Sequence, residues 1–323
     1  MTLAHPRFAY TRGLHNLGRG AYAYLQPDGS WGWSNAGLVA DSGESLLVDT
    51  LFDRRLTREM LAAMRAAEPR AAARIGTLVN THSNGDHTFG NALVEGAEIV
   101  ATEACAAEME GEGPAALLAF QRRAPEMGAL GAYALHCFGA FRFDDVETRL
   151  PTRTFTGRLE LRVGARRIEL LQVGPAHTRG DLLVHVPGDR LLFTGDILFI
   201  EGTPIVWAGP VANWIEACRR IEAMDVETIV PGHGPITDRR GAAAVRGYLE
   251  YVSAEARKRF EAGLSARDAA FDIALGDYAA WGDAERIAVN VSTLYRELSN
   301  DEKPADVVAL FGLMAELHRQ RRR

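Results

Sequence analysis

The first third of the chain alternates short apolar runs with clusters of turn-forming residues. Three such runs, separated by Pro-Asp-Gly-Ser and Asp-Ser-Gly-Glu, occupy residues 21–26, 37–40 and 45–50. Turn residues between short apolar runs are typical of β-hairpins, so we predict strands at all three places. The same pattern predicts further strands within residues 75–80, 98–101, 154–173, 181–187, 190–196 and 227–232.

Elsewhere the apolar positions recur with the period of a helix. Residues 53–68 place Leu56, Met60 and Met64 at helical spacing, and Pro69 follows, so a helix is predicted there. Another helix is predicted over residues 211–224.

Two longer segments are predicted to be mostly helical. Residues 101–145 are rich in alanine and then become aromatic, which indicates a helical insertion broken near Gly113 and Pro114. From residue 237 onward almost the whole pattern is helical. Neither segment is joined to the rest by a linker rich in proline, serine or glycine, so a single domain is expected.

The order of these elements predicts an α/β fold. Two halves, each with strands followed by helices, favour two packed sheets with helices outside. We therefore assign residues 1–240 to one domain that contains the insertion at about 101–145. Residues 241–323 form a helical C-terminal extension packed on the same domain.

Composition narrows the class of protein. The 323 residues carry a net charge of −6, and the pI near 5.9 argues against a nucleic-acid partner. No apolar stretch reaches the roughly 20 residues that span a bilayer, and the N-terminus lacks a secretory pattern, so no membrane is involved. Three cysteines in no paired spacing, Cys105, Cys137 and Cys218, fit the core of a protein in a reducing compartment. A cytoplasmic location is expected.

Four loops that each follow an apolar strand carry side chains able to bind a metal. Their sequences are LVNTHSNGDH, LLQVGPAHTRGD, LLFTGDILF and TIVPGHG. Loops at strand ends can converge on one edge of a sheet, where rigid scaffolds place functional side chains. One such histidine or aspartate alone is more often structural, but four loops together predict a metal site. The candidate ligands are His82, Asp86, His87, His177, Asp196 and His233. Asn84 is a seventh candidate, whose role the sequence leaves open.

The other histidines have more ordinary interpretations. His136 lies in the helical insertion and could reach the metal site. His185 alternates within a predicted strand and is interpreted as structural. His5, His15 and His318 lie near the ends of the chain and are expected to be solvated.

The succession HSNGDH, PAHTRGD, FTGD and PGHG resembles the metallo-β-lactamase fold superfamily, whose signature is HxHxDH followed by a distant His, Asp and His. The opening segment NAGLVADSGESLLVDT is also similar to the first hairpin of that superfamily. The resemblance covers residues from about 20 to 240. It implies a four-layer αβ/βα sandwich with a metal centre at one edge between the sheets.

The resemblance also implies two metal positions. The first would use His82, residue 84 and His177, the second Asp86, His87 and His233, and Asp196 would bridge both. This chain departs from the signature at Asn84, where HxNxDH replaces HxHxDH. Asn84 could be a weak ligand, could leave the first position without a metal, or could bind substrate through its amide. One or two divalent ions are expected, with zinc favoured and iron or manganese as alternatives.

These residues and the resemblance predict a metal-dependent hydrolase. A metal-bound hydroxide would attack an ester, lactone, thioester or amide bond of a small molecule, with Asp86 orienting it or moving a proton. The alternative is a mononuclear non-haem iron oxygenase, because His82, His177 and Asp196 form a two-histidine, one-carboxylate set. A small-molecule substrate is expected, and the amphipathic helices after residue 240 allow a homodimer.

Overall fold

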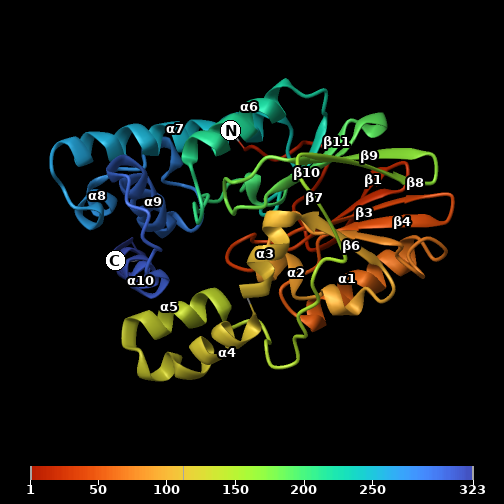
Figure 1. Ribbon diagram of the computed structural model, residues 1–323, viewed down its shortest axis with the longest axis horizontal. Coiled ribbons are helices and arrows are strands. Elements are labelled where there is room, and N and C mark those ends of the chain that lie inside the picture. The colour runs from red at the N-terminus through yellow and green to blue at the C-terminus, as the bar shows by residue number, and fades with distance from the viewer. Residues whose placement is uncertain (1, 112, 322–323) are drawn as a thin grey trace.

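Two β-sheets form one side of the protein, on the right of Figure 1, in a computed structural model that describes residues 2–111 and 113–321. Within these residues the first sheet contains, in order, β1 (Gly13–Gly18), β2 (Ala21–Leu25), β3 (Ala36–Asp41), β4 (Glu44–Val48), β5 (Thr77–Val79), β6 (Glu98–Thr102) and β7 (Arg153–Phe155). The second contains β12 (Thr228–Val230), β11 (Leu191–Phe193), β10 (Leu182–Val186), β9 (Arg166–Gln172) and β8 (Arg158–Val163).

Strand direction changes within each sheet. Strands β1 to β4 are antiparallel, whereas β4 to β7 run parallel to one another. In the second sheet β8 to β11 are antiparallel, and β12 pairs parallel with β11. The parallel strands β4, β5 and β6, and β11 with β12, therefore end at a common edge of their sheets.

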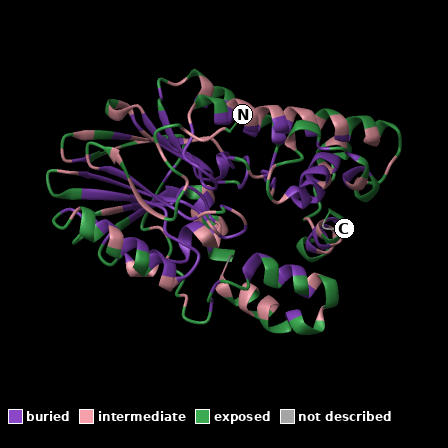
Figure 2. Ribbon diagram, turned by 180° about the vertical axis from the view of Figure 1, so that it is seen from behind, coloured by how far each residue is buried: buried purple, intermediate pink, exposed green. Residues whose placement is uncertain are grey.

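Neighbouring side chains of a strand point to opposite faces of the sheet and so form two apolar layers. Leu38 pairs with Leu47, and both side chains pack in the cluster that includes the helices. Their neighbours Val39 and Leu46 also pair, but they pack in the cluster between the two sheets. Successive side chains of a strand point to opposite faces, so each of these central strands is buried on both sides. In Figure 2 buried residues follow the strands, while exposed residues lie on the outer helices and loops.

Helices cover the outer face of each sheet. On the first sheet lies α1 (Arg54–Ala67), whose N-cap Asp53 accepts a 2.7 Å hydrogen bond from the Leu56 amide. Beside the second sheet, α6 (Val211–Ala223) and α7 (Arg239–Glu261) pack against each other (Figure 1). The predicted four-layer αβ/βα sandwich is therefore confirmed.

The remaining helices belong to the insertion and the extension. The insertion supplies α3 (Glu103–Gly111), α4 (Pro114–Arg123) and α5 (Gly128–Phe138), and the extension supplies α8 (Ala266–Asp272), α9 (Ile287–Ser299) and α10 (Val307–Arg321). Shorter helices are α2 (Gly85–Thr88), η1 (Asn91–Leu93), η2 (Ala124–Glu126), η3 (Pro187–Asp189), η4 (Gly195–Ile197), η5 (Gly276–Tyr278) and η6 (Ala284–Arg286). Because α10 packs against α5, the insertion and the extension meet (Figure 1). The division of the chain at residue 240 stays a prediction.

One strand was not predicted from the sequence, and another was not separated from the run that follows it. Strand β1 has no regular alternation of apolar residues and pairs only at the edge of its sheet. Strand β7 was included in the predicted run 154–173, but it pairs with β6 in the first sheet, whereas β8 and β9 belong to the second. All three cysteines are buried, as predicted. Within residues 2–111 and 113–321, no helix is both long and apolar enough to cross a membrane.

A buried arginine attaches the extension to the sandwich. Arg286 of η6 is 2% exposed, and its guanidinium forms a 2.8 Å ion pair with Asp283. It also donates a 3.0 Å hydrogen bond to the carbonyl of Thr203 and lies 4.5 Å from the centre of the Trp31 ring. A buried guanidinium in such a setting is held by an ion pair, a hydrogen bond and a cation–π contact together.

We expect Arg286→Met to lower the free energy of unfolding by about 3–5 kcal/mol, because it leaves the carboxylate of Asp283, whose side chain is only 9% exposed, without its cation. The matched control is Arg153→Met, which removes an exposed 3.3 Å ion pair with Glu98 and should change stability by less than about 1 kcal/mol. Denaturant unfolding of both variants measures the difference. Equal losses would contradict a role for Arg286 as the attachment point.

Candidate metal centre

The predicted ligands lie together where the parallel strands end. His82 and Asn84 follow β5, and α2 then carries Asp86 and His87. The other three belong to the second sheet: His177 lies between β9 and β10, Asp196 lies in η4 after β11, and His233 follows β12. All four histidines and Asp196 are buried, as expected of side chains that face a shared interior space.

The ligand atoms form two groups that share a boundary. One atom each from His82, His177 and Asp196 lies within 4.8 Å of the others, and the same holds for Asp86, His87 and His233. Asp196 faces both groups, because its Oδ1 is 3.1 Å from Nε2 of His87 and its Oδ2 is 3.4 Å from Nε2 of His177. The second group has the three residues that the family resemblance implies for the second position, whereas the first group contains Asp196 where the resemblance has residue 84.

Each histidine of the centre is oriented by a hydrogen bond at Nδ1. This leaves every Nε2 directed at the interior space, which is the arrangement usual for metal-binding histidines. The Nδ1 partners are Thr81 Oγ1 for His82 at 3.0 Å, Asp49 Oδ2 for His87 at 3.0 Å, the Ile205 carbonyl for His177 at 2.7 Å and the Gly29 carbonyl for His233 at 2.9 Å.

Asp49 is a supporting residue that the sequence analysis missed. It is fully enclosed, and its carboxylate accepts hydrogen bonds from the amide and the hydroxyl of Thr81, each at 2.7 Å, besides its contact with His87. Burial raises the pKa of Asp49, although the neighbouring His87 acts in the opposite direction. The signal was present, since Asp49 directly follows β4 just as the ligands follow their strands.

Buried atoms without hydrogen bonds show that these residues fit a metal ion. Nε2 of His82, Nε2 of His87 and Oδ1 of Asp196 are buried and form no hydrogen bond within the described residues, although the last two face each other at 3.1 Å. Buried polar atoms normally have a hydrogen-bond partner. Imidazole nitrogens and carboxylate oxygens are the ligands that zinc, iron and manganese accept.

Asn84 directs its side-chain oxygen at the first ligand group. It occupies the N-cap of α2, yet its side chain makes no capping bond, and its Oδ1 lies 2.8 Å from Nε2 of His177. Because Nδ1 of His177 donates to the Ile205 carbonyl, Nε2 of the neutral ring is an acceptor. With the amide in this orientation two acceptors face each other, an arrangement that a bound cation satisfies.

Opposing charges set the protonation of the centre. Burial acts to lower the pKa of His233, but the carboxylates of Asp196 and Asp86 outweigh it and raise the pKa to about 9. The same balance raises the pKa of His87 well above its usual value. By contrast, burial and the neighbouring His87 hold the pKa of His82 well below its usual value. A metal ion that enters the second group must therefore displace protons.

The cavity next to the centre has a volume of about 400 Å³ and includes His233 in its wall. His136, which was considered as a residue that could reach the site, lines this cavity. His318 lines it too; its side chain is 20% exposed and lies 3.2 Å from Glu285. His185 instead lies beside Glu169, with 3.3 Å between Nδ1 and Oε2.

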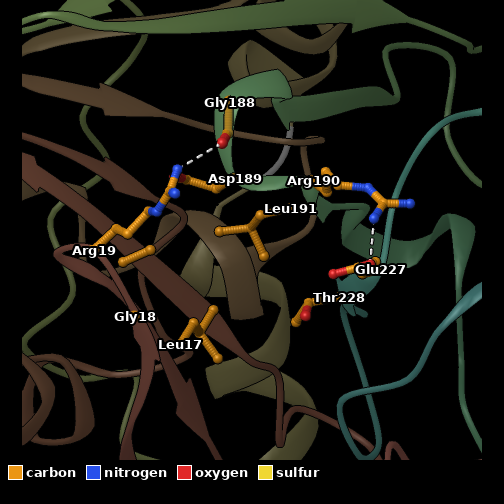
Figure 3. Close-up of a pocket in the computed structure, with 10 residues that line it drawn as sticks. Leu17, Gly18, Arg19, Gly188, Asp189, Arg190, Leu191, Glu227 and Thr228 are labelled. Atoms are coloured by element: carbon orange, nitrogen blue, oxygen red, sulfur yellow. Dashed lines mark hydrogen bonds and ion pairs between the residues drawn. The ribbon is translucent and has the colours of Figure 1, made fainter.

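A second cavity has a different character. It measures about 270 Å³ and lies where β1, β11 and β12 approach one another (Figure 3). Arg19 donates a 3.0 Å hydrogen bond to the carbonyl of Gly188 there, and Arg190 pairs with Glu227. None of the seven predicted ligands lines it, so the cavity beside His233 is the one associated with the metal centre.

Comparison with known families gives a match over most of the sandwich. The family model described as the metallo-beta-lactamase superfamily matches residues 29–233. This segment contains every predicted ligand and ends at the last of them, His233.

Known proteins with similar sequences have several activities. The chain is 27% identical over 195 residues to the 2,4-dinitroanisole O-demethylase subunit alpha of Nocardioides sp. (strain JS1661), across 58% of this chain and 48% of that protein. It is 28% identical over 214 residues to the acyl-coenzyme A thioesterase MBLAC2 of Bos taurus, across 62% of this chain and 72% of that one. A 72-residue segment is 35% identical to a hydroxyacylglutathione hydrolase of Fuscovulum blasticum, across 22% of this chain and 28% of that protein. The match therefore spans about half the length of the O-demethylase subunit.

Solved structures with the same fold are more distant in sequence. The sec-alkylsulfatase Pisa1 from Pseudomonas sp. superposes with a TM-score of 0.68 at 16% identity, over 92% of this chain and 52% of that one. A metallo-beta-lactamase from Pontibacter korlensis gives a TM-score of 0.56 at 17% identity, over 74% of this chain and 99% of that one. These likenesses show the fold of the chain.

Metal affinity should rise with pH between 6 and 9. In the metal-free protein His233, with its pKa of about 9, is protonated below that pH, and the pKa of His87 is also raised by the carboxylates around it, so a binding ion must displace protons. Each proton displaced strengthens the apparent affinity by about tenfold per pH unit, and the contribution of His233 ends near pH 9. Competition with a chelator across this range measures the slope. An affinity independent of pH would contradict the protonation assigned to the second group.

Asn84→His should strengthen metal binding at the first group, because an imidazole nitrogen is a better zinc ligand than an amide oxygen. We expect the number of ions per chain to approach two at lower metal concentration than in the unsubstituted protein. Elemental analysis and zinc titration measure this. Unchanged stoichiometry and affinity would mean that Asn84 does not face a metal position.

Proposed function

The chain belongs to the metallo-beta-lactamase superfamily, and from the geometry of its centre we propose that it is a metal-dependent hydrolase of ester-type bonds in small molecules. The observation that carries this proposal is the position of Asp196, which belongs to one ligand group and also faces His87 of the other. A carboxylate shared in this way suits a pair of divalent ions. The similarity to a thioesterase and to hydroxyacylglutathione hydrolases supports a metallo-hydrolase in general.

A divalent ion held by these groups would supply an acidic water and would polarise the oxygen of the bond to be cleaved. The chain's own contribution centres on Asp86. Its Oδ2 lies 3.2 Å from Nε2 of His233 and 3.8 Å from Nε2 of His87. At 13% exposure the Asp86 side chain is the more open of the two carboxylates in the centre. We therefore assign Asp86 two tasks, as a ligand and as the group that accepts a proton from the attacking water.

The adjacent cavity supports a small substrate. Its volume of about 400 Å³ falls within the range of small-molecule sites. Tyr10 and Ser30 offer hydroxyl groups along its wall, and Ile200 offers an apolar surface. An ester, lactone, thioester or amide bond would enter from this side, next to His233.

The alternative is an oxygenase that uses a single non-haem iron. His82, His177 and Asp196 form a compact two-histidine, one-carboxylate group, which is the ligand set of such enzymes. Oxygen dependence separates the two functions, because hydrolysis consumes water and no oxygen.

We expect Asp86→Asn to reduce kcat/KM for the best substrate of an ester, lactone, thioester and amide panel by at least about 100-fold, because an amide cannot accept the proton. Asp225→Asn is the control, since that carboxylate is 80% exposed and pairs with Arg190 beside the other cavity. Assays in air and under nitrogen, with the metal content measured, complete the test. Full activity of the Asp86 variant would contradict the mechanism, and turnover that requires oxygen would favour the oxygenase.

A further inference from the structure

A separate group of metal-ligating side chains lies where the insertion meets the extension. His136 comes from α5, Glu285 from η6 and His318 from α10, and one ligand atom from each lies within 4.8 Å of the others. We propose that these three residues bind a divalent transition-metal ion in the wall of the cavity beside the metal centre. This site does not depend on the reaction catalysed at the centre.

The contacts within this group hold its side chains in the orientation expected of metal ligands. Nδ1 of His318 is 3.2 Å from Oε1 of Glu285, and the rings of His136 and His318 have centroids 4.5 Å apart. The hydroxyl of Tyr133, one turn before His136 on α5, donates a 3.1 Å hydrogen bond to the same oxygen of Glu285. Outer hydrogen bonds of this kind orient carboxylates that bind metals.

Glu285 has a buried carboxylate that pairs with a histidine. It is 4% exposed, and its ion-pair partner in the described residues is His318. The adjacent Arg286 is directed elsewhere, to Asp283 and to the carbonyl of Thr203. A buried carboxylate is costly unless a cation or several hydrogen bonds compensate for it. A metal ion between Glu285 and the two imidazoles would supply that positive charge.

His136 supplies a ring that is available for coordination. It is exposed, and within the described residues it has ring contacts with Tyr133 and His318 but no hydrogen bond at either ring nitrogen. His136, Glu285 and His318 all line the 400 Å³ cavity, so an ion can reach them from solvent. Two histidines and one carboxylate form a set suited to zinc, manganese or iron, and they leave positions open towards the cavity.

An ion at this site would have two effects on the protein. It would join α5 to α10, and so connect the insertion to the extension across the cavity. It would also offset the negative charge of the carboxylates that line the same cavity, which include Asp28, Glu201 and Asp283. The charge of a substrate that the cavity accepts would then depend on whether this outer site is filled.

Zinc stoichiometry in single variants tests the proposal. His136→Ala and Glu285→Gln should each bind about one zinc ion fewer per chain than the unsubstituted protein. His185→Ala is the matched control, because His185 pairs with Glu169 away from both groups, and it should bind the full number. Elemental analysis after equilibration with buffered zinc gives the count, and circular dichroism checks that each variant is folded.

Asp196→Ala provides the complementary measurement. It is combined with His87→Ala, so that each group of the centre keeps only two of its three residues, and we expect the ion that this double variant retains to be the one bound by His136, Glu285 and His318. Adding His136→Ala to this variant should remove that ion. Equal zinc content in the unsubstituted protein, His136→Ala and Glu285→Gln would overturn the proposal and leave a hydrogen-bonded cluster in its place. Failure of the hydrolase assay alone would not affect this outcome.

Discussion

The position of Asp196 constrains the rest of the molecule. Its carboxylate is 4% exposed and is surrounded by four imidazoles. The Nε2 atoms of these rings lie 3.1 to 3.7 Å from the carboxylate oxygens and belong to His87, His177, His233 and His82. A buried carboxylate in an apolar sandwich is unfavourable unless positive charge stands beside it. The loops after β5, β9, β11 and β12 must therefore converge on one point, and the parallel strand pairs make that convergence possible by ending at the same edge.

Most of the sandwich and the ligands were predictable because their signals are local. Strand alternation, turn residues and a histidine or aspartate directly after a strand can all be recognised within ten residues of sequence. Gly232 directly precedes His233 in the sequence, but only the structure shows that a Cβ there would collide with Oδ1 of Asp196. Asp49 was missed for a different reason, since it acts through His87 and lies 38 residues from it along the chain.

The part that sequence reasoning could not provide is the assembly of the helical additions. Nothing near His318 in sequence indicates that it meets His136 and Glu285, because the three come from different helices brought together by packing. The same is true of Arg286, whose guanidinium lies 5.3 Å from the ring of Phe199. Phe199 in turn stacks on the ring of His233, with centroids 5.0 Å apart and an interplanar angle of 6°. The extension thus reaches a ligand of the centre through one aromatic ring.

Ligands drawn from both sheets have a thermodynamic consequence. An ion that binds His82 from the first sheet together with His177 and Asp196 from the second binds the closed sandwich and not the unfolded chain. By mass action, free metal at a hundredfold excess over its dissociation constant would add about 2.7 kcal/mol to the folded state. The metal supply of the surroundings would then set how much of this protein survives heat or proteolysis, and starvation for the ion would reduce its abundance as well as its activity.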